Sequence, residues 1–274
     1  QARCGGRIVS NVFMRNVTGL DDPMRSSDGG AVSVFDKSRP VIENNVFLEN
    51  EALSSNAAGG LFVALWSSPV VRGNVFVGNR CADDAGALFV GGQEHRYDAP
   101  LDPLPPREDF YVTVEENVFM GNANPSRNSG VMRFTMESRG AFRGNVTAHN
   151  TGVYFQRCEA VIEDNVILDN FRLVETKEGL HPCTVRNNTI WGNLDIQTEA
   201  VIAGNRMKVA WEGNTTEDPR FSDDRIVFAA DAAVYDPFAC ATEVLVVGDG
   251  FKPGALANRV VRSGERWSVV ASNE

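Results

Sequence analysis

The sequence lacks the features that mark several classes of protein. No apolar run approaches the roughly 18 residues that a membrane-spanning helix needs, so we expect no membrane partner. Lys and Arg total 26 against 36 for Asp and Glu, and the net charge of −10 argues against a nucleic acid as the partner. A phosphate-binding loop, a GxSxG nucleophile elbow and an HExxH zinc motif are also missing. These absences leave no signature of a nucleotide-binding protein, an α/β-hydrolase or a zinc protease.

Cysteine is scarce as well. The five cysteines are an odd number without a CxxC pair, which excludes the usual zinc and thioredoxin spacings and a dense disulfide framework. The first residue is Gln1 rather than Met and no signal peptide follows it, so we expect that residues upstream have been removed.

What the sequence has instead is a repeat. Eight segments align on one asparagine: SNVFMRN at Asn11, NNVFLEN at Asn45, GNVFVGN at Asn74, ENVFMGN at Asn117, GNVTAHN at Asn145, DNVILDN at Asn165, NNTIWGN at Asn188 and the degraded GNRMKVA at Asn205. Seven of them carry a second asparagine five residues later, at Asn16, Asn50, Asn79, Asn122, Asn150, Asn170 and Asn193. A minimal unit of about 20 residues with variable additions predicts a solenoid whose coils carry insertions at their turns.

The columns of the repeat predict strands. The residues three before and two after each anchor are almost all β-branched, aromatic or otherwise apolar, in short runs broken by Gly and Asn. Stacked coils place equivalent residues about 4.8 Å apart. We therefore expect each asparagine column to hydrogen-bond to itself and to the backbone of the turns.

A third column alternates in charge. Two residues before the anchors stand Glu43, Arg72, Glu115, Arg143, Glu163 and Arg186. A parallel stack favours opposite charges in register. The pattern predicts a structural salt-bridge ladder, and these six residues are therefore not candidates for a functional site.

The NVFxxN units, the asparagine columns, the Gly-led strands and the segment GNTTEDPRF (213–221) resemble the right-handed parallel β-helix proteins of the pectate-lyase-like group. The resemblance covers roughly residues 1–221 and implies an all-β, right-handed parallel β-helix solenoid of about eight coils. The group includes lyases, hydrolases, epimerases and non-catalytic adhesins. The resemblance implies a polysaccharide partner and a secreted or cell-surface location of the bacterial type.

The two ends of the repeat differ. Residues 222–274 do not repeat, and their alternating stretches around Gly-containing turns predict a small antiparallel β-rich tail that caps the last coil. At the N-terminal end the repeat has already begun at Ile8. We expect either an upstream segment or a partner, such as a second copy of the chain, to cover the first coil.

One strand of each coil, which begins with Gly, offers an outer face. Alternation predicts that Val32, Val34, Leu61, Val63, Leu88, Val90, Met132 and Phe134 point inward. The set predicted to point outward is Ser33, Phe35, Phe62, Ala64, Phe89, Arg133, Thr135, Val153 and Phe155, followed near the strand ends by Lys37, Trp66, Gln93, Glu137 and Arg157. Because Arg133 is placed outside, Arg133→Ala is expected to leave folding intact.

Aromatic residues on this face are candidates for substrate binding. Phe62, Trp66 and Phe89 could stack on sugar rings, with His95 and Tyr97 in the insertion 92–111 as a wall of a cleft. The alternative is that the insertion folds over these rings and buries them. Burial is favoured because large exposed apolar patches are rare. Burial of the rings and binding of a sugar are compatible if the insertion forms one wall of a cleft.

The resemblance also implies the chemistry. In lyases of this fold a Lys or Arg removes the proton beside a uronate carboxylate, and calcium held by acidic residues neutralises that carboxylate. Arg133, Arg157, Lys177 and Glu175 would form such a group if the coils stack as counted. The sequence shows no acidic cluster of the calcium-binding kind, so no metal ligand is assigned and calcium stays open as a cofactor.

Two functions follow from these residues. The first is a lyase, or else a hydrolase with paired carboxylates such as Asp83 and Asp84 or Asp98 and Asp102, that acts on an acidic glycan in the outer groove. The alternative is a non-catalytic β-helix for carbohydrate binding, adhesion or structure. An enzyme needs Arg133, Arg157, Lys177 and an acidic group in one open cleft, whereas a binder needs only the aromatic strip.

Overall fold

The computed structural model describes residues 4–19, 29–53, 57–92, 109–125, 130–174, 183–196, 201–202, 205–206, 209–217, 232–236, 241–245, 260–263 and 266–269. The elements of these ranges are β-strands. Within the same ranges, no helix has the length and apolar character that crossing a membrane requires.

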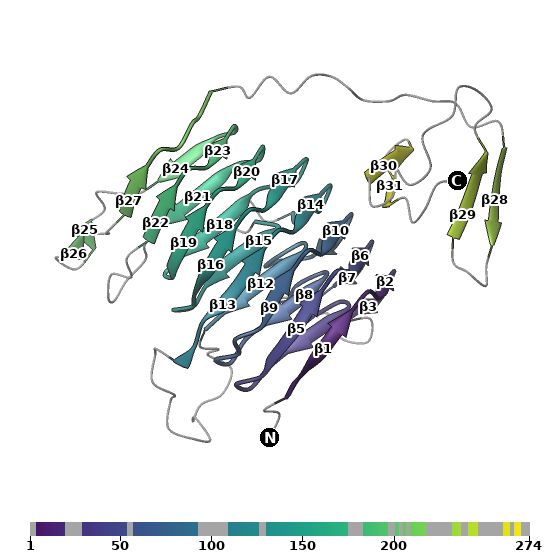
Figure 1. Ribbon diagram of the computed structural model, residues 1–274, viewed down its shortest axis with the longest axis horizontal. Helices are drawn as coiled ribbons and strands as arrows, with labels where there is room; N and C mark the ends of the chain where they lie inside the picture. Colours follow the sequence, from purple (N-terminus) through teal and green to yellow (C-terminus); the bar gives the residue numbers. More distant parts are fainter. Residues whose placement is uncertain are drawn as a thin grey trace. The chain divides into compact units, whose positions relative to one another are not determined.

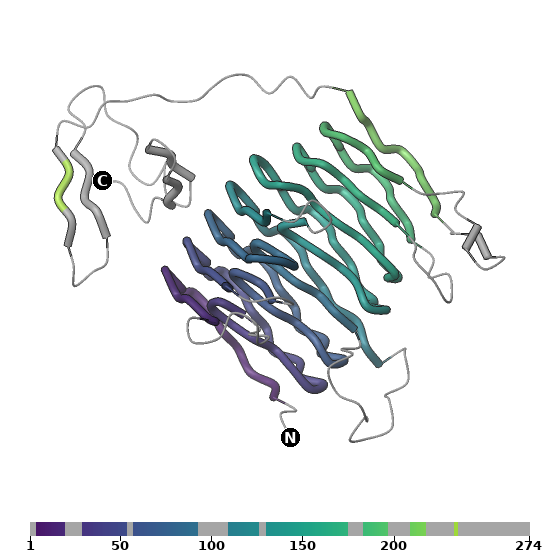
Figure 2. Tube along the Cα trace, turned by 180° about the vertical axis from the view of Figure 1, so that it is seen from behind, coloured from purple at the N-terminus to yellow at the C-terminus, as the bar shows by residue number. Residues whose placement is uncertain are grey.

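Most of the strands lie in parallel sheets that run along a solenoid, as Figures 1 and 2 show from two sides. The β1–β27 sheet contains, in spatial order, β1 (Gly5–Val9), β5 (Arg39–Glu43), β9 (Val70–Arg72), β13 (Val112–Glu115), β16 (Arg139–Arg143), β19 (Glu159–Glu163), β22 (Cys183–Arg186) and β27 (Val209–Glu212). The β2–β23 sheet contains β2 (Val12–Met14), β6 (Val46–Leu48), β10 (Val75–Val77), β14 (Val118–Met120), β17 (Val146–Ala148), β20 (Val166–Ile167) and β23 (Thr189–Ile190).

The β4–β24 sheet closes the coil. It contains β4 (Val32–Val34), β8 (Leu61–Val63), β12 (Leu88–Gly91), β15 (Met132–Thr135), β18 (Val153–Gln156), β21 (Phe171–Val174) and β24 (Leu194–Ile196). Three short strands, β3 (Val17–Thr18), β7 (Glu51–Ala52) and β11 (Arg80–Cys81), form a further parallel sheet in the first coils. The fold is a parallel β-helix solenoid, which confirms the predicted fold class.

The core follows the predicted columns. Phe47, Phe76 and Phe119 are fully buried in neighbouring coils, with ring centroids 4.5 and 4.8 Å apart and nearly parallel planes. Their strands pair in register, so equivalent side chains stack directly on one another. Burial of each such ring contributes about 1.5–3 kcal/mol, and the stacked column holds the coils together.

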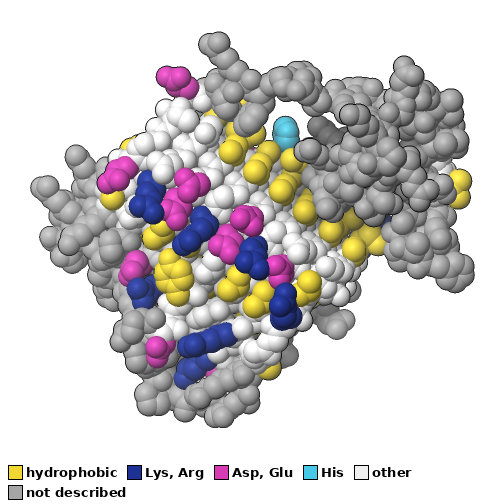
Figure 3. Space-filling view, in the orientation of Figure 1, with side chains coloured by type: hydrophobic (Ala, Val, Ile, Leu, Met, Phe, Trp, Pro, Cys, Tyr) yellow, Lys and Arg dark blue, Asp and Glu magenta, His cyan; other side chains and the backbone are white. Residues whose placement is uncertain are grey.

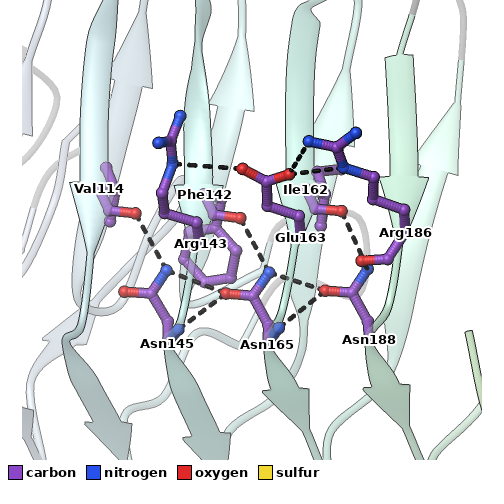
Figure 4. Close-up of polar contacts among 9 residues, drawn as sticks. All are labelled: Val114, Phe142, Arg143, Asn145, Ile162, Glu163, Asn165, Arg186 and Asn188. Atoms are coloured by element: carbon purple, nitrogen blue, oxygen red, sulfur yellow. Dashed lines mark hydrogen bonds and ion pairs between the residues drawn. The ribbon is translucent and has the colours of Figure 1, made fainter.

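The predicted asparagine ladder is present and is shown for three coils in Figure 4. Asn165 Oδ1 accepts from Asn145 N at 2.8 Å and from Asn145 Nδ2 at 3.1 Å. Asn165 Nδ2 donates to Asn188 Oδ1 and to Phe142 O, both at 2.8 Å. The same contacts join Asn11, Asn45, Asn74 and Asn117 to Asn145. The anchors from Asn45 to Asn188 are buried, so these hydrogen bonds satisfy amide groups that are withdrawn from solvent.

The structure corrects the eighth anchor. Asn188 N and Nδ2 donate to Asn214 Oδ1 at 2.9 and 2.8 Å, so Asn214 rather than Asn205 continues the ladder. Asn205 instead lies in β26 (Asn205–Arg206), which pairs antiparallel with β25 (Val201–Ile202). The segment between β24 and β27 is thus an insertion, and Asn205 belongs to this insertion rather than to the repeat.

The second asparagine column also ends differently from the prediction. Asn16, Asn50, Asn79, Asn122 and Asn150 form a ladder. The next acceptor is Asp169, whose carboxylate accepts from Asn150 N at 2.9 Å and from Asn150 Nδ2 at 2.7 Å. Asn170, the predicted member, is displaced to the exposed surface because the turn after β20 is one residue shorter.

The charged column forms salt bridges, as predicted. Glu43 lies 2.6 Å from Arg72, and Glu163 lies between Arg143 at 3.6 Å and Arg186 at 2.5 Å. Figure 3 shows the alternating positive and negative side chains on this face, with a row of hydrophobic side chains beside them. The neighbouring row consists of valines that follow the anchors in register: Val12, Val46, Val75, Val118, Val146 and Val166.

The C-terminal residues carry the predicted antiparallel structure. β28 (Ala232–Asp236) pairs antiparallel with β29 (Ala241–Leu245), and β30 (Val260–Ser263) forms a two-stranded sheet with β31 (Arg266–Val269). By contacts the chain divides into a unit of Gln1–Asp218 with Arg262–Ser268 and a unit of Pro219–Val261 with Val269–Glu274. The expected boundary after residue 221 and the capping role stay predictions.

Candidate functional site

The candidate site lies on the outer face of the β4–β24 sheet. The residues predicted to point inward from its first strands are in the core, among them Leu61, Val63, Leu88 and Val90. The prediction is wrong for Val153 and Phe155, which are core residues expected on the outside. Met132 pairs with Val153 and Arg133 with Tyr154, because the turn after β18 is one residue shorter than the turn after β15.

Over the first coils this outer face is apolar. Phe62 and Phe89 are only 1% exposed, and their rings stack with centroids 4.7 Å apart and planes 3° apart. Their cluster contains Ala58, Ala64 and Ala85, which belong to the same coils rather than to the insertion 92–111. The two rings are buried, and one face of each covers the other. Residues 93–108 of the insertion lie outside the described residues, so burial by the insertion stays a prediction.

The other aromatic candidates lie elsewhere. Trp66 is partly buried against the core and meets Phe110 edge-to-face, with ring centroids 5.7 Å apart. Phe110 ends the insertion and is itself fully buried. His95 and Tyr97 lie outside the described residues, so their role as a wall stays a prediction.

Over the later coils the outer face is polar. One column runs through neighbouring strands as Arg133, Tyr154, Arg172 and Asp195. The exposed fraction of the charged side chains rises along it, from 15% for Arg133 through 32% for Arg172 to 50% for Asp195. This polar column, with Asp84 and Gln156 beside it, is the candidate site.

Arg133 is the least exposed charged residue of the column. Its guanidinium forms an ion pair with Asp84, whose side chain is 7% exposed, and donates to Gln156 Oε1 at 3.0 Å. Asp84 comes from the turn that precedes β12. These contacts give Arg133 a structural task that joins separate coils, in addition to the catalytic role proposed for it.

Tyr154 lies between two guanidinium groups. Arg133 and Arg172 stand 5.4 and 5.1 Å from the centre of its ring. Burial raises the pKa of the Tyr154 hydroxyl, against the opposing effect of Arg172 and Arg133. Both faces of the ring are occupied by cations, so Tyr154 positions the two arginines and offers no face to a sugar.

Arg172 is the accessible cation of the column. Its Nε lies 2.8 Å from Asp195 Oδ2, and both side chains reach the surface. The two side chains are 32% and 50% exposed, and ion pairs this near the surface contribute about 0–1 kcal/mol. A carboxylate on a ligand can therefore replace Asp195 at small cost.

Arg157 occupies a turn at the edge of the same sheet, with a positive φ of 45°. Its backbone N donates to Val174 O at 3.3 Å, and its O accepts from Glu137 N at 2.8 Å. Glu175 follows Val174 in the chain, but Glu175 and Lys177 lie outside the described residues. The convergence of Arg133, Arg157, Lys177 and Glu175 stays a prediction.

The described residues contain no group of three or more His, Cys, Asp or Glu side chains placed to hold a metal ion. No ligand set for the calcium that the sequence leaves open can therefore be named among them.

Sequence reasoning missed Tyr154, Gln156, Arg172 and Asp195, and it named Asp84 only as a carboxylate paired with Asp83, not as the partner of Arg133. A signal for the column exists in the triplets Met132–Phe134, Val153–Phe155, Phe171–Leu173 and Leu194–Ile196, in which a polar or aromatic residue stands between two apolar ones. Aligning strands on these triplets, rather than counting back from the asparagine anchors, would have found the register.

No family model, curated protein or solved structure matches this chain.

Proposed function

We propose that this β-helix binds an acidic polysaccharide along the polar column on the outer face of the β4–β24 sheet. The observation that carries the proposal is the column itself, in which the arginine side chains become more exposed to solvent from Arg133 to Arg172. The resemblance of the repeat to the pectate-lyase-like β-helices supports a polysaccharide as the ligand.

Arg172 is the residue that recognises the glycan in this proposal. A guanidinium binds a carboxylate through two parallel hydrogen bonds, which suits the uronate groups of acidic glycans. Arg172 has a weak, partly exposed ion pair to exchange, whereas Arg133 is paired with Asp84 and both of those side chains are largely withdrawn from solvent. The glycan therefore binds at Arg172 and leaves the Arg133 contacts intact.

Binding without catalysis is the better supported form of this function. The base in a lyase must be able to reach the substrate proton, and Arg133, the first candidate, is only 15% exposed and ion-paired. A lyase or hydrolase is the second candidate. It is favoured by the hydrogen bond from Arg157 N to Val174 O, which brings Arg157 to the strand end that precedes Glu175.

The test measures binding and turnover on the same samples. Hexagalacturonate, alginate hexamers and hyaluronate hexamers are titrated into the protein by calorimetry, with and without calcium. Arg172→Ala is expected to weaken binding at least about tenfold, which corresponds to 1.4 kcal/mol. The matched control is Arg143→Ala, which removes the same charge from the β1–β27 sheet, where that side chain is 42% exposed, and is expected to leave binding unchanged.

The outcomes separate the candidates. The proposal fails if none of the acidic oligosaccharides binds, or if the two arginine variants weaken binding equally. Ultraviolet absorbance from unsaturated products on incubation would establish a lyase, and new reducing ends without that absorbance would establish a hydrolase. Either result replaces the non-catalytic form of the function with the second candidate.

A further inference from the structure

The corner after the β2–β23 sheet departs from the repeat in the last coils. In the earlier coils the third residue after the anchor is buried or half-buried, and Leu48 and Val77 have 8% and 0% exposure. In the coil of Asn188 the equivalent residue is Trp191, which is 48% exposed. A large indole thus stands at the surface in a position where the smaller side chains of the earlier coils are buried or half-buried.

The backbone explains why Trp191 stands there. Its N donates to Ile167 O at 2.8 Å, which fixes the strand against the preceding coil. A Cβ on the next residue, Gly192, would lie 2.3 Å from Asp169 O, so only glycine permits this close approach. The chain therefore turns tightly after Trp191, with the indole directed away from the core.

A hollow lies beside the indole, next to the shortened turn of the preceding coil. Because Asp169 takes the ladder position, Asn170 is displaced outward. An open pocket of about 350 Å³ lies between these coils, lined by Trp191, Asp169, Asn170 and His149 among others. Its volume falls within the range of small-ligand sites, which is about 300–1,000 Å³.

The lining combines an apolar plate with hydrogen-bonding groups. The exposed indole offers a flat face of the kind that the C–H face of a sugar ring covers. His149, on a turn with a φ of 59°, is exposed at the rim. Asp169, which also lines the pocket, is 5% exposed and accepts hydrogen bonds from Asn150 N and Nδ2, so the lining includes a largely buried acidic side chain.

We propose that this pocket binds one neutral sugar residue, with the ring against Trp191 and its hydroxyl groups hydrogen-bonded to His149 and Asp169. A uronate is excluded because its carboxylate would approach that of Asp169. The pocket is built from the corner of the β2–β23 sheet, whereas the polar column lies on the β4–β24 sheet. The inference therefore does not rest on the proposed function.

The experiment titrates the full chain with cellohexaose, xylohexaose and mannohexaose by calorimetry, with hexagalacturonate as the acidic comparison. At least one neutral hexamer is expected to bind, and Trp191→Ala to weaken that binding at least about tenfold, or 1.4 kcal/mol. Trp191→Phe, which keeps an aromatic face, is expected to stay within about threefold of the wild type. Trp211→Ala removes another exposed indole, 37% exposed in β27, and is expected to have no effect.

Folding is controlled with Trp191→Leu, which keeps an apolar side chain but no aromatic plate and is expected to lose binding with an unchanged melting temperature. The inference is overturned if no neutral hexamer binds, or if Trp191→Leu and Trp191→Ala bind like the wild type. It is also overturned if Trp211→Ala weakens binding as much as Trp191→Ala. Failure here leaves the binding of hexagalacturonate at Arg172 untouched, so the two proposals fail separately.

Discussion

The guanidinium of Arg133 and the carboxylate of Asp84 form an ion pair in which both side chains are largely withdrawn from solvent. Asp84 precedes β12 and Arg133 belongs to β15, so the pair ties two neighbouring coils together on the outside of the solenoid. Removing one partner would leave the other charge buried without compensation.

Arg133→Ala is therefore expected to destabilise the protein by about 3–5 kcal/mol. This replaces the expectation from the sequence that the substitution leaves folding intact. Urea denaturation measures the loss. The matched change is Arg172→Ala, whose exposed ion pair contributes about 0–1 kcal/mol. Equal stability of the two variants would show that the Arg133 pair is not buried as described.

Asn165→Leu tests the asparagine ladder. The change removes the acceptor of Asn145 and the donor to Asn188 and Phe142 O, and each buried group left unsatisfied costs about 1–3 kcal/mol. A strong loss of unfolding free energy is expected in urea denaturation. Asn193→Leu, at an exposed position outside this ladder, is the control and is expected to stay within about 0.5 kcal/mol of the wild type. A wild-type unfolding free energy for Asn165→Leu would contradict the structural role of the ladder.

Asp169 predicts a dependence of stability on pH. Burial raises its pKa above the ordinary value of 3.8, against hydrogen bonds from Asn150 and Thr147 and the nearby charge of His149. The folded protein then binds the proton more tightly than the unfolded chain, so this stabilisation is full below pH 3.8 and is lost as the pH rises through the folded pKa.

Asp169→Asn removes that titration and restores the residue type of the ladder. The variant is expected to gain stability relative to the wild type at neutral pH, with the gain shrinking as the pH falls toward 3.8. Melting temperatures of both proteins across the pH range measure the difference. A constant difference at all pH values would show that the Asp169 pKa is the same in the folded and unfolded chains.

Glu163→Gln tests the charged column. Glu163 contacts Arg143 and Arg186 on its two neighbouring coils, and its side chain is 11% exposed. We expect a loss of about 1 kcal/mol at low ionic strength that becomes smaller in 1 M salt, where charges are screened beyond roughly 3 Å. Urea denaturation at the two salt concentrations measures it, and a loss independent of salt would point to packing instead.

The repeat predicts the solenoid because its columns are set by contacts between coils. Phe47, Phe76 and Asn74 must meet the same residue types in the next coil, so the pattern survives in one sequence. Counting residues from the asparagine anchors gives the wrong register where a turn changes length. The turn that contains Arg157 is one residue shorter, so counting back from Asn165 misplaces Val153 and Phe155, which precede that turn. The turn before Asp169 is also one residue shorter, which moves Asn170 out of the ladder.

The candidate site was less predictable for a related reason. Residues on the outer face have no partner type imposed by the core, so Arg133, Tyr154 and Arg172 follow no repeat. Asp84 reaches Arg133 from a turn 49 residues earlier, a pairing that only the stacking of the coils reveals. The sequence alone offers both side chains as candidates but not the ion pair between them.

The column of asparagine anchors and the charged column beside it place different limits on how such a chain can change its length. Excising residues 145–164 would bring the donors of Asn117 to the acceptor of Asn165, and the ladder would close as before. The same excision would remove Glu163 and set Arg143 against Arg186, two like charges in register that Glu163 now separates. The amide column accepts the loss of a single coil, whereas the charged column favours the loss or gain of coils in pairs.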